Sequence, residues 1–179
     1  MDKHDLFLTL EGGKSCSTSE AVMAAARVLE QPELFPVLFG GLSHERSLTR
    51  MRCAYAVSMV ADSRPDLLQP HKEAFFDKLA ASDNSHLARA CMIRTLPQLK
   101  LTEDDISMLK DMLLDFLHSS SSIVKTFSLQ MLADFAEHMP GMRAEVMPLI
   151  WDASLNGTPA MKARARKLLK GYSISPSPV

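Results

Sequence analysis

The sequence predicts an all-α protein in which antiparallel helix pairs repeat along the chain as an α–α superhelix. The first observation is a basic residue that returns at a near-constant interval, since positions 50, 89, 125 and 162 are separated by 39, 36 and 37 residues. A period in this range is typical of helical repeats. The second is a series of apolar residues at helical spacing. The third is a composition with 46% hydrophobic but only 6% aromatic residues, which does not favour strands.

The N-terminal segment, residues 1–31, predicts a degenerate cap, because the end units of stacked arrays are usually atypical. Residues 4–11 are expected to form a short helix before the Gly12–Gly13 pair. The run from Ser17 to Glu20 matches a capping box, which would open a helix over 19–30.

Four helix pairs are predicted between residues 32 and 172. Their expected bounds are 32–42 with 44–61, 72–81 with 86–98, 102–118 with 123–139, and 142–155 with 158–170. Proline and polar turns separate the helices, because proline cannot continue a helix without losing a hydrogen bond. The tail, 173–179, is predicted to be disordered.

Local signals in the third and fourth pairs support these bounds. Thr102 caps three acidic residues at a helix start, where the helix dipole favours negative charge. The serine run 119–122 reads as a tight turn between two helices. In the fourth pair, Gly157 suits a left-handed C-cap, Thr158 an N-cap and Pro159 the first helical turn.

The second helix of each pair carries a recurring pattern, which is clearest over 123–135. A polar turn precedes a Val–Lys pair, with a small residue four positions after the valine and a leucine eight positions after it. This pattern resembles a HEAT repeat, and it is also similar to adaptin and other armadillo-type repeats. The resemblance covers roughly 19–172. It implies one solenoid domain over 1–172, a right-handed stack of helix pairs with the second helices along one face, and a role as a binding scaffold.

Motifs that carry catalysis are not found in the sequence. There is no Gly-rich phosphate loop, HExxH helix, nucleophile elbow or calcium loop. The six histidines are dispersed, and none pairs with another at metal-ligand spacing. We therefore expect no enzyme activity and no catalytic, cofactor-binding or metal-binding residues.

The expected compartment is the cytoplasm. The three cysteines, Cys16, Cys53 and Cys91, form no CxxC pair, which fits a reducing environment. No run approaches the roughly 20 apolar residues of a membrane span. The N-terminus lacks the basic lead and apolar core of a secretory signal.

Eight basic residues are the candidates for partner binding. They are Arg50, Arg89, Lys125, Lys162, Arg164, Arg166, Lys167 and Lys170. The four repeated ones form a ladder that either bonds turn carbonyls or acids in adjacent units, or lines the inner face and contacts an acidic segment or a phosphate backbone. The last five give the final helix a charge of +5, against −6 for residues 1–152. That helix is either a solvated cap or a docking patch.

The function that the sequence favours is a non-catalytic protein–protein interaction or scaffold module with a protein partner, acidic if charge contributes. The alternative is a nucleic-acid-binding or DNA glycosylase-like protein of the same fold. Trp151 would then be a base-contacting residue, but we expect it to pack beneath the last helix. A third possibility is a subunit that completes a larger helical assembly. The sequence indicates no oligomeric state.

Overall fold

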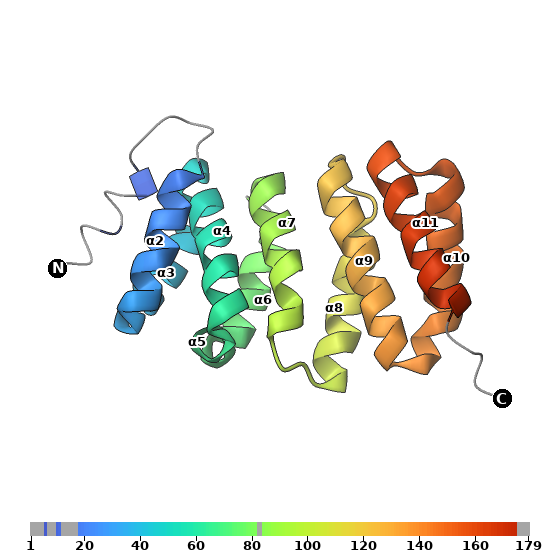
Figure 1. The fold of residues 1–179 in the computed structure, drawn as a ribbon, viewed down its shortest axis with the longest axis horizontal. Helices are drawn as coiled ribbons and strands as arrows, with labels where there is room; N and C mark the ends of the chain where they lie inside the picture. The colour runs from blue at the N-terminus through green and yellow to red at the C-terminus, as the bar shows by residue number, and fades with distance from the viewer. Residues whose placement is uncertain (1–5, 7–9, 12–17, 82–83, 175–179) are drawn as a thin grey trace. The chain divides into compact units, whose positions relative to one another are not determined.

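The computed structural model describes Leu6, Leu10, Glu11 and residues 18–81 and 84–174. These residues form α-helices and short 3-10 turns with no strand among them, so the all-α fold class is confirmed (Figure 1). The chain divides into two compact units, Met1–Lys100 and Leu101–Val179, which are described in turn. The expectation of one domain over 1–172 stays a prediction.

Unit 1 contains the helices of the N-terminal half of the chain. Its elements are α2 (Ser19–Glu30), η1 (Pro32–Leu34), α3 (Phe35–Gly40), η2 (Gly41–Ser43), α4 (Ser47–Ser63), α5 (Pro65–Leu68), η3 (Gln69–His71), α6 (Lys72–Ala80), α7 (His86–Thr95) and η4 (Leu96–Gln98). The predicted helix over 32–42 is broken into three short segments. The prediction over 44–61 began three residues early, because α4 begins at Ser47. The predicted break near Pro97 is the 3-10 turn η4.

In unit 1, α4 packs against both α2 and α7 (Figure 1). Val57 of α4 and Leu96 at the end of α7 are fully buried, as the repeat register predicts. Side chains one repeat apart also meet. Arg94 donates to the Ser58 hydroxyl at 2.6 Å, across an interval of 36 residues. The sequence period therefore corresponds to contacts between successive second helices within this unit.

The N-terminal prediction was partly wrong. Helix α2 has the predicted bounds, but its N-cap Thr18 makes no side-chain capping bond. The Glu20 carboxylate instead accepts a hydrogen bond from Ser19 and pairs with Arg52 at 3.4 Å. Arg52 also donates to the Leu10 carbonyl at 2.7 Å. Ser17 and most of the predicted helix over 4–11 lie outside the described residues.

Unit 2 contains two helix pairs, α8 (Glu103–Phe116) with α9 (Ser122–His138), and α10 (Pro140–Asn156) with α11 (Pro159–Ile174). The capping box at Thr102 is present, with hydrogen bonds to and from Asp105. Helix α11 continues through residues 173 and 174, so the predicted disordered tail begins too early. The remainder of that tail, 175–179, lies outside the described residues.

The two pairs of unit 2 pack side by side. Helix α11 lies against α9 and α10, and α10 also contacts α9 (Figure 1). Lys110 of α8 pairs with Glu145 of α10 at 3.1 Å, and the Tyr172 hydroxyl of α11 donates to the Ala133 carbonyl of α9 at 2.7 Å. Leu132 is fully buried at the centre of α9, as predicted. Leu169, which was predicted to be buried, is only half-buried.

The turn between α10 and α11 corrects one prediction. Gly157 has φ −68° and ψ 171°, which is extended backbone and not a left-handed C-cap. The glycine is needed for space, because a Cβ atom there would lie 2.5 Å from the Ala153 carbonyl oxygen and 2.8 Å from the Met161 Cβ. Thr158 accepts a 3.4 Å bond from the Met161 amide and Pro159 begins α11, as predicted.

Candidate interaction surface

The first two members of the basic ladder are held inside their own repeats. Arg50 is 8% exposed and donates to the carbonyls of His44 and Glu45 at 2.6 and 2.9 Å. Arg89 donates to the Ala81 carbonyl at 2.6 Å. Each guanidinium therefore ties together the turn before its helix, which is the structural interpretation of the ladder. Neither side chain is presented to a partner in this conformation.

The third member, Lys125, is half-buried beside a cavity of about 350 Å³ in unit 2. Leucines from α8, α9 and α10 contribute to the cavity wall, with Lys125 and Asp152 among its polar groups. A positive and a negative group therefore share the lining, which selects for neither an anionic nor a cationic ligand. The cavity supports no specific ligand chemistry.

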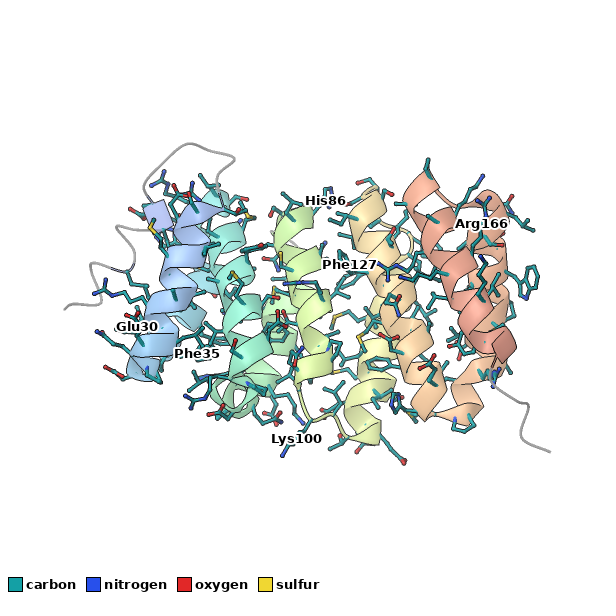
Figure 2. The ribbon with its side chains drawn as sticks, in the orientation of Figure 1. Glu30, Phe35, His86, Lys100, Phe127 and Arg166 are labelled. Atoms are coloured by element: carbon teal, nitrogen blue, oxygen red, sulfur yellow. The ribbon has the colours of Figure 1, made fainter. Side chains whose placement is uncertain are left out.

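The basic residues of α11 divide into two sides of the helix. Arg164 points toward α9, where it donates to the Gln130 side chain at 2.9 Å. Arg166 lies two residues later, about 200° further around the helix, and therefore on the side away from α9 (Figure 2). Lys162 and Lys170 lie about one turn before and after Arg166, on the same side. Lys167 is exposed between these two sides.

None of Lys162, Arg166, Lys167 and Lys170 has a side-chain partner in the part of the chain that the structure describes. Unit 2 as a whole has eight Lys and Arg against nine Asp and Glu residues, so it carries no excess positive charge. Its cations are instead concentrated on one helix. The line formed by Lys162, Arg166 and Lys170 is thus an unbalanced local charge.

Trp151 is not where the sequence prediction placed it. It was expected beneath the last helix, but its side chain is 56% exposed on α10. Leu155, one turn later, is 66% exposed. Ala144 and Pro148 are also exposed on the preceding turns. These four residues follow helical spacing and form a continuous apolar stripe along α10.

The stripe lies on the side of α10 that faces away from α8. Glu145 pairs with Lys110 of α8, and Leu149 lines the cavity together with Leu114 of α8. Trp151 follows Leu149 by two residues, which places it about 200° around the helix from that contact. The α10 stripe and the α11 cation line therefore share one side of the second pair. We call this surface, formed by Ala144, Pro148, Trp151, Leu155, Lys162, Arg166 and Lys170, the outer face.

Pro148 adds a polar feature to the outer face. It lies inside α10 and has no amide hydrogen, so the Ala144 carbonyl has no donor from the residue four positions later. Both residues are exposed. The regular helical hydrogen bond is therefore missing at this point of the outer face.

The cysteine thiols of the described region are not activated. Burial raises the pKa of the Cys53 thiol to about 12. Burial also raises the pKa of the Cys91 thiol, against a smaller lowering by the Arg94 guanidinium. Both thiols are therefore protonated at neutral pH and are poor nucleophiles.

Metal sites and membrane-spanning helices are not found among the described residues. Across residues 18–81 and 84–174 and the short N-terminal part that is described, no group of three or more His, Cys, Asp or Glu side chains could hold a metal ion. No helix in that same region is both long and apolar enough to cross a bilayer.

Comparison of the chain with protein-family models, curated proteins and solved structures gave no match.

Of the eight predicted site residues, the structure brings Lys162, Arg166 and Lys170 together on the outer face and leaves Lys167 exposed beside them. It places Arg50, Arg89 and Arg164 in internal hydrogen bonds, and Lys125 beside the cavity. Sequence reasoning missed the apolar stripe of α10. Its spacing is visible in the sequence, but α10 also carries the buried stripe Met142, Val146, Ile150 and Ala153 at the same spacing. The sequence does not show which of the two faces the core.

Proposed function

We propose that this chain is a non-catalytic protein–protein interaction module built from HEAT-like helix pairs, with the outer face as a binding surface. The observation that carries the proposal is the exposed apolar stripe centred on Trp151 and Leu155. Contiguous apolar surface beside polar groups is typical of interaction sites, and tryptophan and arginine are the residues that most often dominate binding energy.

The helical-repeat part of the proposal is supported by contacts within each unit. Side chains meet at intervals close to the sequence period, such as Ser58 with Arg94 and Ser122 with Thr158, each 36 residues apart. A stack of this kind presents extended binding surfaces rather than a single catalytic pocket. The cytoplasm remains the compartment we propose, because Cys53 and Cys91 are free thiols.

Nucleic-acid binding is the second candidate, and one observation favours it. An exposed tryptophan on the same face as Arg166 and Lys170 could stack on a base while the cations contact phosphates. The aliphatic remainder of the stripe argues for protein, because Leu155 and Pro148 offer no stacking surface. The lack of excess positive charge in unit 2 argues the same way, since phosphate contacts dominate nucleic-acid affinity.

The test is affinity capture from an extract of the source organism with three forms of the full chain. They are the wild type, the double variant Trp151→Ser/Leu155→Ser, and Leu87→Ser as a matched control. Leu87 is 53% exposed on α7 of unit 1, so its replacement removes a similar apolar side chain elsewhere. Exposed positions contribute little to folding stability, and unfolding midpoints of all three forms should agree.

We expect a defined protein to be recovered by the wild type and by Leu87→Ser, and to fall about tenfold or more with the double variant. Nuclease treatment of the extract should leave this recovery unchanged. Equal recovery by the double variant would show that the outer face is not the binding surface. Recovery of RNA or DNA that depends on Trp151, with loss of all protein after nuclease treatment, would favour the second candidate.

A further inference from the structure

We propose that the outer face takes an acidic amphipathic helix of a partner protein. The partner's apolar side would lie on the Trp151–Leu155 stripe, and its carboxylates would face Lys162, Arg166 and Lys170. This inference rests on the proposed function and adds to it the shape and the charge of the partner.

The junction between α8 and α10 inside unit 2 supplies the template. Leu114 of α8 lines that junction opposite Leu149 of α10. Trp151 follows Leu114 by 37 residues, the same interval that separates Lys125 from Lys162. Trp151 therefore holds, in the second pair, the position that Leu114 holds in the first. Leu114 is half-buried at the cavity between α8 and α10, whereas Trp151 is exposed.

The charges at the same junction indicate the sign of the partner. Lys110 of α8 forms an ion pair with Glu145 of α10 at 3.1 Å. At this junction the first pair thus contributes a cation, and the helix next to it contributes a carboxylate. On the outer face, the cations Lys162, Arg166 and Lys170 come from the second helix of the second pair, and no acidic side chain of the described residues pairs with them.

The form of the surface favours a helix over an extended segment. The apolar residues recur at spacings of four, three and four along α10. From the first to the last, this stripe spans roughly 16 Å of helix axis. The cations on α11 recur every four residues. A helix with apolar residues at three and four positions apart and acids along one flank matches both series, as in ridge-into-groove packing.

A second copy of this chain fits less well. A symmetric contact through the outer face would use the same patch on both copies. That patch contains Lys162, Arg166 and Lys170 and no acidic residue, so it offers these cations no carboxylate on the other copy. Like-charge contacts disfavour association, so the complementary partner is a different, acidic chain.

The experiment selects binders from a library of displayed helical peptides about 20 residues long. The outward positions are randomised, and tryptophan is omitted. The bait is the full-length wild-type chain. Peptides that also bind the charge-reversed variant Arg166→Glu/Lys170→Glu are sorted into a separate pool. The selected peptides are then titrated into wild type, the charge-reversed variant, Leu155→Ser, and two matched controls in unit 1, Leu87→Ser and Lys100→Glu.

Trp151 is the only tryptophan of the chain, so its emission reports directly on docking. We expect the enriched peptides to carry a row of Asp or Glu beside an apolar stripe and to shift Trp151 emission to the blue. Their affinity should fall about tenfold or more in Leu155→Ser and in the charge-reversed variant, and stay unchanged in both controls. The charge-reversed variant should enrich peptides with Lys or Arg instead.

Other outcomes overturn the inference. Peptides bound equally by wild type and the charge-reversed variant would show that the outer face docks a helix without selecting acid, which leaves the proposed function standing. Selected peptides that bind wild type and Leu155→Ser with equal affinity would contradict a helical partner on the outer face. A blue shift that grows with protein concentration alone, with doubling of mass in sedimentation, would assign the face to a second copy. Quenching of Trp151 by a single-stranded oligonucleotide, lost in the charge-reversed variant, would assign it to nucleic acid.

Discussion

At the scale of single residues, burial changes what charged side chains do. Arg50 and Arg52 are two residues apart in α4, and both are buried and donate to groups inside the protein. The Arg52 side chain has 0% exposure; it donates a hydrogen bond to the Leu10 carbonyl and forms an ion pair with the Glu20 carboxylate. It therefore anchors part of the N-terminal segment to α4. Arg166 and Lys170 of α11 are also basic but remain exposed, which makes them available for binding.

Replacing Arg52 with Met should destabilise the protein by roughly 3–5 kcal/mol, because the nearly buried Glu20 carboxylate would lose its counter-charge. Urea unfolding followed by circular dichroism measures this loss. The double variant Arg52→Met/Glu20→Leu removes both charges and should recover most of the stability. A loss below about 1 kcal/mol for the single variant would mean that the pair is solvated and not buried.

At the scale of elements, α10 carries two apolar stripes and α11 follows it after a very short turn. One stripe of α10 packs inside unit 2, and the other is exposed as part of the outer face. The position of α10 depends on the turn at Gly157, where the end of α10 and the first turn of α11 approach too closely for a side chain. That turn sets how the two halves of the outer face meet.

Gly157→Ala should therefore destabilise the protein by about 1–3 kcal/mol, since the new Cβ atom would press on backbone and force a shift. Gly141→Ala is the matched control, because a Cβ atom added to that helical glycine would meet nothing within 4 Å. The control should be neutral or more stable by up to about 1 kcal/mol. Equal unfolding midpoints for the two variants would contradict the close approach.

At the scale of the whole molecule, the chain consists of two compact units, and each has its own core. The repeat period appears in both, as contacts between side chains 34 to 36 residues apart, such as Gln130 with Arg164 and Ser58 with Arg94. In unit 2, α9 lies between the neighbouring helices α8, α10 and α11. Its buried side chains therefore support the outer face from behind.

Leu132→Ala, at the centre of α9, should cost roughly 2–5 kcal/mol, because it removes a fully buried side chain and leaves a cavity. Hydrogen exchange read by mass spectrometry should show faster exchange across α8 to α11, since these helices share one core. Leu155→Ala on the outer face should change stability by less than about 0.5 kcal/mol. Faster exchange confined to the turns around position 132 would contradict a cooperative unit 2.

The sequence by itself determined the helical class, most helix bounds and the repeat interval, because these follow from local spacing of apolar residues and from capping residues. Helix α2 and the capping box at Thr102 are examples. Tertiary structure alone decided which stripe of α10 is buried, since both have helical spacing and only the positions of α9 and α11, which pack against α10, distinguish them. It also decided that Arg50 bonds a turn whereas Arg166 faces solvent, because a charge is satisfied or exposed according to the carbonyls that long-range packing brings near it.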